Sequence, residues 1–452
     1  MGKKINFSII FYLIISFPNS NQNLNLTSPY SPYSEIEKYT INTQKLKIGI
    51  ISDSQIIPRI EYSWLDHFTD KLKKALFYFK ESNIDILIFA GDLGDECTDL
   101  SWNTWRQAFD EVYLNSNKIP ILNVVMGNHD YYCDEDAIFI QEKFERLIKE
   151  KPFTHKVING IHFINWSNEN AEMDDRAYQN INWVKNQIEI SIKENPKNPI
   201  IITTHINPRN TVYGSVNSGS NNIYNLFKNY NQIINISGHS HYSLLDERSI
   251  FQKDFTVIQT QSISYVELDY NRENGSIPKD EYDNTEIASQ SNIGLIMEIS
   301  KEQIEIKRIS FENNRFINDP WIIDLPINKN KFKYTNEIRK QNAIKPYFDF
   351  SKDEYKEIDF IYERFWIVKF KQAIHPNWVY NYKLIFSNEN VNYSFLYYSD
   401  FYQIPEFRKE IIRLKIPERL NKGIYNVTII AIESFGLESE NNLTGVFEKN
   451  LK

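Results

Sequence analysis

Five short motifs carry side chains that could bind a metal ion. Each follows a short apolar run, and each contains a carboxylate, an amide or an imidazole, which are common ligands of divalent cations. The motifs are Asp53-Ser54-Gln55, Gly91-Asp92-Leu93-Gly94-Asp95, Gly127-Asn128-His129-Asp130, His205 and Gly238-His239-Ser240-His241. A lone histidine is more often a hydrogen-bonded structural residue than a ligand, but four of the chain's eight histidines lie in these motifs. We therefore expect one metal site built from distant segments.

The segments that must position these motifs alternate between two kinds of pattern. Apolar runs typical of buried strands cover 46–51, 84–90, 121–126, 162–166, 200–204 and 233–237. Apolar spacings of three and four residues predict helices over 62–82, 99–115, 136–150 and 175–194. This alternation predicts a mostly parallel sheet with helices on its faces, in which ligands gather at the carboxyl ends of the strands. Further runs at 255–265, 293–299 and 304–311 predict a second sheet.

The order and spacing of the motifs resemble the calcineurin-like metallophosphoesterase family. Its pattern is Asp-x-His, Gly-Asp-x-x-Asp, Gly-Asn-His followed by Asp or Glu, then His, then Gly-His-x-His. The resemblance covers residues 46–311 and implies a four-layer α/β/β/α sandwich. It also implies hydrolysis of a phosphoester by a hydroxide that bridges two divalent metal ions.

The resemblance implies a role for each motif residue. One metal ion would be surrounded by Asp53, Gln55, Asp92 and His241, and the other by Asp92, Asn128, His205 and His239. His129 would face the leaving oxygen as a proton donor, and Asp130 would orient its ring. Asp95 stands where purple acid phosphatases have a tyrosine, so an iron(III)-tyrosinate centre is not expected, and Asp95 is expected to be a loop cap or a partner of a site residue.

Gln55 departs from the family's commonest pattern, which has histidine there. Its amide oxygen can bind a cation, but it is neutral and harder than an imidazole nitrogen. We therefore expect manganese or magnesium at the first site, with iron or zinc as alternatives at the second, and favour manganese. In having glutamine at position 55, the chain resembles family members that cleave nucleotide diphosphate linkages.

Four residues outside the ligand set have open assignments. Arg59 could hold a second phosphate or a carboxylate, and Tyr213 could stack on a base, with plain solvated surface as the alternative for both. Cys97 and Cys133 are the only cysteines, and each follows a motif by a few residues. They could bridge two loops or remain free thiols.

At 452 residues the chain is longer than one hydrophobic core usually organises. We expect a signal peptide at 1–20, a linker at 21–43, a metallophosphoesterase domain at 44–312, a linker at 313–345 and a β-sandwich domain at 346–452. The last domain has strand-like runs without helices, and its closing segment resembles fibronectin type III sandwiches. The signal peptide follows from Lys3, Lys4 and an apolar stretch over 5–17. This stretch is short for a membrane span, so stable membrane insertion is not expected, and an uncleaved anchor is the alternative.

The net charge is -8 and no long basic run is present, which argues against tight nucleic-acid binding. The sequence thus predicts a secreted, metal-dependent phosphoester hydrolase acting on a small phosphoester or a nucleotide, with phosphodiesterase or nucleotide pyrophosphatase as the leading hypotheses. The sandwich domain could bind a cell surface or a glycan. The alternative is an inactive scaffold that serves as an adhesion protein, and the retention of the other motif residues argues against it.

Overall fold

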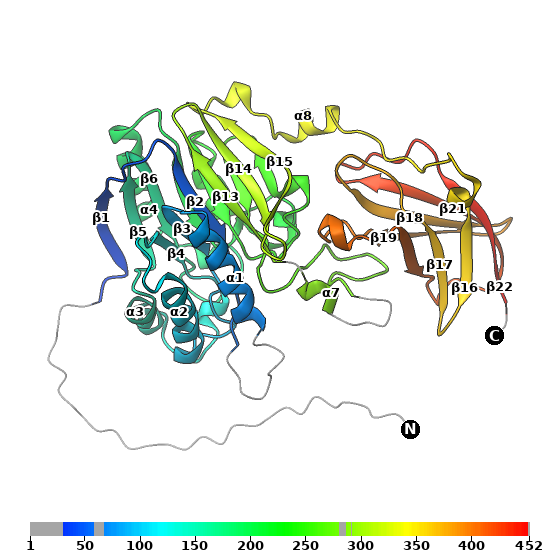
Figure 1. Cartoon of the computed structure of the whole chain (residues 1–452), viewed down its shortest axis with the longest axis horizontal. Helices are drawn as coiled ribbons and strands as arrows, with labels where there is room; N and C mark the ends of the chain where they lie inside the picture. Colours follow the sequence, from blue (N-terminus) through cyan, green and yellow to red (C-terminus); the bar gives the residue numbers. More distant parts are fainter. Residues whose placement is uncertain (1–29, 58–66, 280–285, 291, 451–452) are drawn as a thin grey trace, which may run out of the picture. The chain divides into compact units, whose positions relative to one another are not determined.

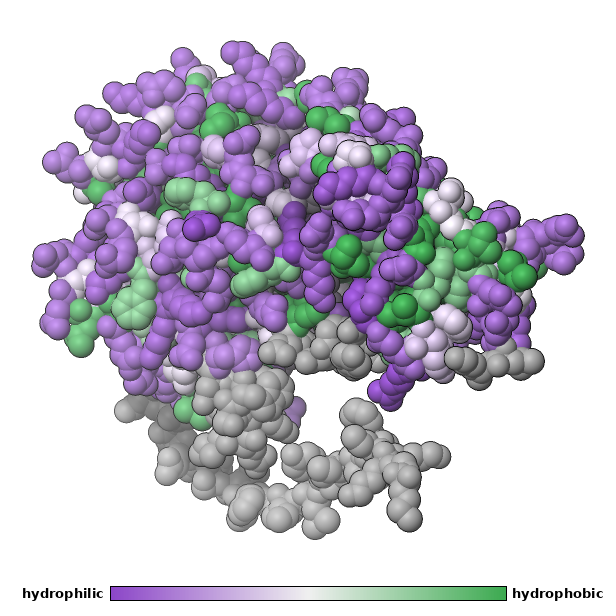
Figure 2. Space-filling view, turned by 45° about the vertical axis from the view of Figure 1, so that its right-hand side comes forward, coloured by the Kyte–Doolittle hydropathy of each residue, from purple (hydrophilic) through white to green (hydrophobic). Residues whose placement is uncertain are grey.

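The computed structural model describes residues 30–57, 67–279, 286–290 and 292–450. The predicted signal peptide and Arg59 lie outside these residues. Hydrophilic side chains cover most of the face seen in Figure 2. None of the described helices is both long enough and apolar enough to cross a membrane.

Two β-sheets form the centre of the N-terminal domain (Figure 1). The seven-stranded sheet has the order β1 (Tyr33–Tyr39), β5 (Phe153–Ile158), β6 (Ile161–Trp166), β7 (Ile200–Thr204), β10 (Ile233–Ser237), β12 (Thr256–Gln259) and β11 (Ile250–Gln252). The six-stranded sheet has the order β15 (Arg315–Asp324), β14 (Gln303–Ser310), β13 (Ile293–Ile299), β2 (Leu46–Ile51), β3 (Ile86–Ala90) and β4 (Ile121–Val125). A separate two-stranded sheet consists of β8 (Asn207–Pro208) and β9 (Gly219–Ser220).

The outer faces of these sheets are covered by α1 (His67–Glu81), α2 (Asp99–Tyr113), α3 (Ala137–Ile148), α4 (Ile181–Glu194) and α6 (Asn221–Phe227). The other helices are the short α5 (Ser215–Ser218), α7 (Glu286–Ser289) and α8 (Asn336–Gln341). Side-chain caps set several helix starts: Thr98 accepts a hydrogen bond from the backbone of Ser101, and Asp136 does so from Ile138.

The buried side chains confirm the predicted four layers. In β3, Ile86 and Ile88 join the core between the two sheets, whereas Leu87 and Phe89 join the core under α1, α2 and α3. A separate cluster packs α4 and α6 against the other face of the seven-stranded sheet. Both faces of β3 are therefore covered, which explains why its sequence is apolar without alternation.

Seven antiparallel strands form the C-terminal sandwich. One sheet has the order β16 (Ile358–Tyr362), β17 (Trp366–Lys371) and β20 (Ile411–Lys415), and the other has β19 (Asn392–Tyr398), β18 (Val379–Ser387), β21 (Gly423–Glu433) and β22 (Leu443–Lys449). Tyr425, Val427, Ile429 and Ala431 alternate inward along β21 and are at most 1% exposed. The predicted β-sandwich is confirmed.

Two predicted linkers contain strands. β1 lies in the predicted linker 21–43 and pairs in parallel with β5, and β15 lies in the predicted linker 313–345 and pairs with β14. The sequence of β15 hides its alternation because the register shifts along the strand, where Asn318, Asp319 and Pro320 interrupt the apolar positions. The boundary at residue 312 is therefore wrong, since the six-stranded sheet continues to Asp324.

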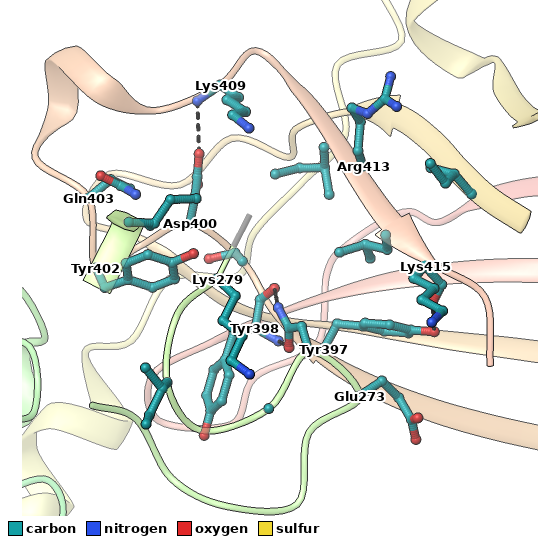
Figure 3. A pocket seen from close by; sticks show the side chains of 18 of the residues that line it. Glu273, Lys279, Tyr397, Tyr398, Asp400, Tyr402, Gln403, Lys409, Arg413 and Lys415 are labelled. Carbon is teal, nitrogen blue, oxygen red and sulfur yellow. Dashed lines mark hydrogen bonds between the residues drawn. The ribbon is translucent and has the colours of Figure 1, made fainter. Parts of the chain in front are cut away.

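A cavity of about 440 Å³ lies between the segment 273–279 and strands of the sandwich (Figure 3). Its described lining includes Glu273, Tyr397, Tyr398, Asp400 and Lys409, and none of its lining residues belongs to the five motifs. The predicted metal site lies elsewhere.

Candidate metal centre

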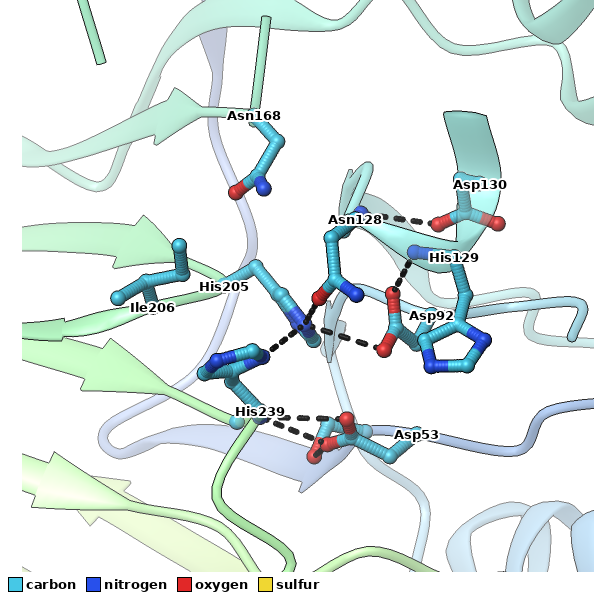
Figure 4. Close-up of polar contacts among 12 residues, drawn as sticks. Asp53, Asp92, Asn128, His129, Asp130, Asn168, His205, Ile206 and His239 are labelled. Carbon is cyan, nitrogen blue, oxygen red and sulfur yellow. Dashed lines mark hydrogen bonds and ion pairs between the residues drawn. The ribbon is translucent and has the colours of Figure 1, made fainter. Parts of the chain in front are cut away.

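All five motifs begin where a strand of the two facing sheets ends. Asp53, Asp92 and Asn128 follow β2, β3 and β4, which are neighbours in the six-stranded sheet. His205 and His239 follow β7 and β10, which are neighbours in the seven-stranded sheet. The strands of each set run parallel, so their carboxyl ends meet, and the structure brings the five motifs together (Figure 4).

Glycines make room for the site side chains. A Cβ atom at Gly127 would overlap a carboxylate oxygen of Asp92, and one at Gly238 would overlap a carboxylate oxygen of Asp53. At Gly91, whose φ is +94°, a Cβ would overlap the ring of His205. The motif glycines are therefore needed chiefly for space beside the ligands.

The backbone at the site is strained. Asp53, Gln55, Asp92, His239 and His241 have φ values of 54°, 41°, 55°, 68° and 54°, in the left-handed region that side chains with a Cβ rarely occupy. Each such residue costs on the order of 1–3 kcal/mol and persists only where its surroundings hold it. Hydrogen bonds between the loops do so here, from Asp53 N to Gly91 O at 2.9 Å and from Gln55 N to Asp92 O at 3.1 Å.

His205 lies at the centre of a first group of potential ligands, which also contains Asp92, Asn128 and His239. Its Nε2 lies 3.2 Å from Asp92 Oδ2, 3.1 Å from Asn128 Oδ1 and 3.2 Å from His239 Nδ1 (Figure 4). Its Nδ1 lies 2.8 Å from the carbonyl oxygen of Ala90, which orients the ring and leaves Nε2 toward the group.

Asp92 also belongs to a second group, with Asp53 and His241. The potential ligand atoms of Asp92, His205 and His239 lie within 4.8 Å of one another, and so do those of Asp53, Asp92 and His241. His241 Nε2 lies 3.4 Å from Asp53 Oδ1, whereas its buried Nδ1 has no hydrogen-bond partner among the described residues. The approach of His241 Nε2 to Asp53, in a group that also contains Asp92, fits a cation site.

Burial and charge act against each other in these groups. Burial raises the pKa of Asp92, but His205, His129 and His239 together hold it well below its ordinary value. Burial lowers the pKa of His205, and the carboxylate of Asp92 outweighs this and raises it to about 9. Burial and the neighbouring His205 lower the pKa of His239 to about 3. Asp92 thus keeps its negative charge although it is buried, as a metal ligand requires.

Gln55 is buried at the Asp53 side of the site. Its backbone N–H bonds to Asp92, and its Oε1 accepts a hydrogen bond from Ser264 Oγ at 3.2 Å. The amide oxygen that we expect to bind a cation is thus held by a neighbouring hydroxyl.

His129 lies at the open side of the groups, with its side chain 25% exposed. Its Nδ1 lies 3.1 Å from the backbone oxygen of Asp95 and 3.2 Å from the Asp95 carboxylate. Burial lowers the pKa of His129, but the hydrogen bond with Asp95 and the charge of Asp92 raise it to about 9. The contact with Asp95 thus favours the protonated ring, which suits a proton donor.

Asp130 does not orient this ring, so that prediction is wrong. Its carboxylate accepts hydrogen bonds from the backbone N–H groups of Gly127, Leu93 and Gly94 and from Trp102 Nε1. It thereby ties the loop of Asp92 to the loop of Asn128. Burial, with the charge of Asp92, raises its pKa to about 6. The sequence suggested Asp130 as the residue that orients the ring because Asp130 is next to His129 in the chain. In the folded structure, Asp95 contacts the ring instead.

Residues 46–243 match the family model of the calcineurin-like phosphoesterases. This part of the chain is a calcineurin-like phosphoesterase domain. The family comprises metal-dependent hydrolases of phosphoesters, so the domain is that of a metallophosphoesterase. No curated protein sequence is significantly similar to the chain.

Solved structures with some similarity to the chain include two phosphatases and an anchor protein. One is a dimetal phosphatase from Danio rerio, with a TM-score of 0.43 and 9% identity over 62% of this chain and 99% of that chain. Another is GAP50, the anchor in the inner membrane complex of Plasmodium, with a TM-score of 0.40 and 15% identity over 63% and 90% of the two chains. The third is a purple acid phosphatase from yellow lupin seeds, with a TM-score of 0.40 and 12% identity over 63% and 54%.

A disulfide joins two loops of the phosphoesterase domain. Cys97, two residues after Asp95, is bonded to Cys133, four residues after His129, with 5.8 Å between their Cα atoms. Of the two arrangements that the sequence left open, the structure has the bridge. It links the segments that carry the His129 and Asp95 pair.

Tyr213 is not available for stacking on a substrate base. Its ring is 5% exposed and packs 4.7 Å from the ring of Tyr242 and 5.9 Å from that of Tyr380 in the sandwich. The prediction that it forms a stacking platform is therefore wrong.

Two other aromatic rings border the site of the phosphoesterase domain. Tyr132 is 37% exposed, its ring lies 4.4 Å from that of His129, and its hydroxyl accepts a hydrogen bond from Asn128 Nδ2. The half-buried ring of Tyr265 lies 4.4 Å from that of His241. The sequence reading missed both, although Tyr132 stands only three residues after His129.

Proposed function

We propose that the chain is a secreted, metal-dependent hydrolase of phosphodiesters or of the diphosphate linkage in nucleotides. The observation that carries this proposal is the convergence of Asp53, Asp92, His205, His239 and His241 where strands of the two facing sheets end, with Asp92 common to two ligand groups. Carboxylates and imidazoles grouped within reach of one point are typical ligands of divalent cations, so the chemistry of these side chains favours metal binding.

The residues fit two divalent cations. Asp53, Gln55, Asp92 and His241 would hold one, and Asp92, Asn128, His205 and His239 the other, with manganese favoured over iron, zinc or magnesium because of the oxygen ligands on the Gln55 side. Such a pair, when bound, supplies positive charge for the phosphate oxygens and lowers the pKa of a water molecule that attacks phosphorus.

The chain's own residues supply the remaining steps. Asp92 and His205 are buried and preset by hydrogen bonds, so little reorganisation is needed on binding. His129, protonated and oriented by Asp95, is placed to donate a proton to the leaving oxygen.

The charge around the site favours a substrate with little negative charge at the reacting phosphorus. Among the described residues, no lysine or arginine side chain forms a hydrogen bond or ion pair with Asp53, Asp92, Asn128 or the site histidines. A phosphodiester carries one negative charge at neutral pH, so it needs fewer cations than a phosphomonoester. The rings of Tyr132 and Tyr265 could contact a nucleoside, and Arg59 remains a candidate for a second phosphate.

The disulfide supports an oxidising compartment, in line with the apolar N-terminal stretch. Expression of the full chain with a C-terminal tag should place it in the culture medium, whereas retention in the cytosol with free thiols would refute secretion.

Metal titration with a substrate panel tests the activity. The purified chain is loaded with Mn²⁺, Mg²⁺, Fe²⁺ or Zn²⁺ and assayed with bis(p-nitrophenyl) phosphate, p-nitrophenyl phosphate and ADP-ribose, beside Asp92→Asn as the matched control. We expect Mn²⁺-dependent cleavage of the diester or of ADP-ribose, faster than that of the monoester, and none by the variant. A wild type that is inactive with every metal would favour the inactive scaffold.

A further inference from the structure

Two neighbouring loops determine the position of His241. The histidine loop (residues 238–249) contains His239 and His241, and the covering loop (residues 265–270) contains Tyr265. The loops pair with each other: the backbone N–H of Glu267 donates to the carbonyl oxygen of His241 at 2.9 Å, and Tyr242 and Glu267 form a parallel bridge. The position of His241 therefore depends on what holds the covering loop.

The sandwich holds the covering loop through Asp269. Tyr380 on β18 donates a hydrogen bond from its hydroxyl to Asp269 Oδ2 at 2.7 Å, and Tyr398 on β19 donates one to the backbone oxygen of Asp269 at 2.6 Å. Both tyrosines are buried, at 4% and 1% exposure, so neither bond competes freely with water.

The sandwich also holds the histidine loop directly. The indole N–H of Trp378 donates to the carbonyl oxygen of Leu245. Ser434 Oγ donates to Asp246 Oδ2 at 3.0 Å, and Asp246 is fully buried and paired with Arg248. Breaking such contacts leaves buried polar groups unpaired, which is costlier than losing an exposed bond.

A stack of rings fills the space between these contacts. Tyr213 packs 4.7 Å from Tyr242, the residue after His241, and the Tyr213 and Tyr380 hydroxyls lie 3.2 Å apart. The Arg248 guanidinium lies 4.3 Å from the Tyr213 ring centre and 4.2 Å from that of Tyr380. The path from the sandwich to the metal group is thus continuous and tightly packed.

The other ligands are held differently. The loops of Asp92 and Asn128 are joined by Asp130, Trp102 and the disulfide, all within the phosphoesterase domain. His205 bonds to Ala90 and Tyr178 in the same domain, and His239, although it lies in the histidine loop, donates its backbone N–H to the Asp53 carboxylate at 3.2 Å. Contacts from the sandwich therefore act on the side of the site that contains His241.

We propose that the β-sandwich supports the metal centre, because Trp378 and Tyr380 hold the loops that position His241 and so set the cation affinity of the Asp53, Asp92 and His241 group. This inference rests on the proposed function, since it takes that group to bind a cation. Trp378 and Tyr380 are positioning residues, and neither touches the substrate.

Tyr380→Phe removes the hydroxyl and keeps the ring. The matched control is Tyr397→Phe, another buried sandwich tyrosine, whose hydroxyl donates to the Lys415 carbonyl within the sandwich. In calorimetric titrations with Mn²⁺, we expect Tyr380→Phe to weaken one of two binding steps by about 3- to 10-fold, the effect of one lost buried hydrogen bond. The other step and the Tyr397→Phe titration should match wild type. The kcat/KM of Tyr380→Phe should fall at limiting Mn²⁺ and recover in excess Mn²⁺, which a general loss of folded protein would not do.

Hydrogen exchange gives a readout that needs no metal. Peptides covering 238–249 and 265–270 should exchange faster in Tyr380→Phe than in Tyr397→Phe, while those covering 121–133 should not change. Asp269→Asn and Trp378→Phe should act in the same direction, and they test the inference if Tyr380→Phe fails to fold.

The outcomes separate this inference from the proposed function. If wild type binds two Mn²⁺ ions and Tyr380→Phe binds them like Tyr397→Phe, the positioning role is overturned and the proposed function stands. If wild type binds no Mn²⁺, the proposed function fails. Unchanged exchange in the two loops would overturn the positioning role in either case.

Discussion

Replacement of Asp95 by asparagine isolates the charge that orients His129. The side chain keeps its size, and the backbone oxygen of Asp95, 3.1 Å from His129 Nδ1, is untouched. Only the carboxylate, 3.2 Å from the same nitrogen, is neutralised. The variant therefore measures how much the negative charge of Asp95 contributes to catalysis by His129, while the His129 ring stays in place.

The structure sets the size of the effect. A hydrogen bond to a charged group contributes about 1.5–3 kcal/mol when it is well buried. The Asp95 side chain is 33% exposed, and solvent screening reduces its contribution to about 1 kcal/mol. This corresponds to a loss of roughly 5-fold in kcat. Complete removal of the donor in His129→Ala should cost far more, on the order of 100- to 10,000-fold.

The assay compares Mn²⁺-loaded enzymes on aryl phosphodiesters that differ in leaving group. The loss in Asp95→Asn should be largest for poor leaving groups such as phenol and nearly absent for p-nitrophenol, because only a poor leaving group needs a proton. Mn²⁺ affinity should stay at the wild-type value. The double variant Asp95→Asn/His129→Ala should be no slower than His129→Ala, since Asp95 acts through the ring.

Asp130→Asn is the contrasting control, because Asp130 holds loops and does not contact the His129 ring. We expect it to lower the thermal midpoint and to slow all substrates equally. An equal loss on every leaving group in Asp95→Asn, or losses that add in the double variant, would refute the role given to Asp95.

Three further predictions concern the metals and the effect of pH. Asp92→Asn should lose both cations and nearly all turnover, because Asp92 belongs to both ligand groups, and two bound Mn²⁺ ions in this variant would contradict the assignment. Gln55→His should stay active and shift its preference from manganese toward zinc, since imidazole is softer, whereas inactivity with every metal would count against our view of the first site. The free energy of unfolding should fall as the pH drops from about 6.5 toward 4, because burial lowers the pKa of His155 and lowers that of His162 to about 4. The unfolded chain then binds protons that the folded chain does not, so urea titrations of His162→Asn should give a shallower fall, and an unchanged fall would exclude this cause.

The sequence predicted the N-terminal domain well where each element carries its own signal. The strands before the motifs and the helices 99–115 and 136–150 lie within a few residues of their predicted positions, because apolar periodicity and capping residues are local. The sequence did not predict β1 and β15, because these strands lack a clear local pattern and form through pairing with other strands. β1 pairs with β5, more than a hundred residues away, and β15 pairs with β14 in a register that shifts along the strand.

The candidate site divides in the same way. The sequence by itself determined which residues could bind metal, since ligand chemistry belongs to residue types and each motif follows the end of a strand. The tertiary structure decided which neighbours act on them: Asp95 rather than Asp130 contacts His129, Tyr213 is buried, and Tyr380 reaches the loop beside His241. Contacts between distant segments depend on how the layers and domains pack, and no local pattern along the chain records that packing.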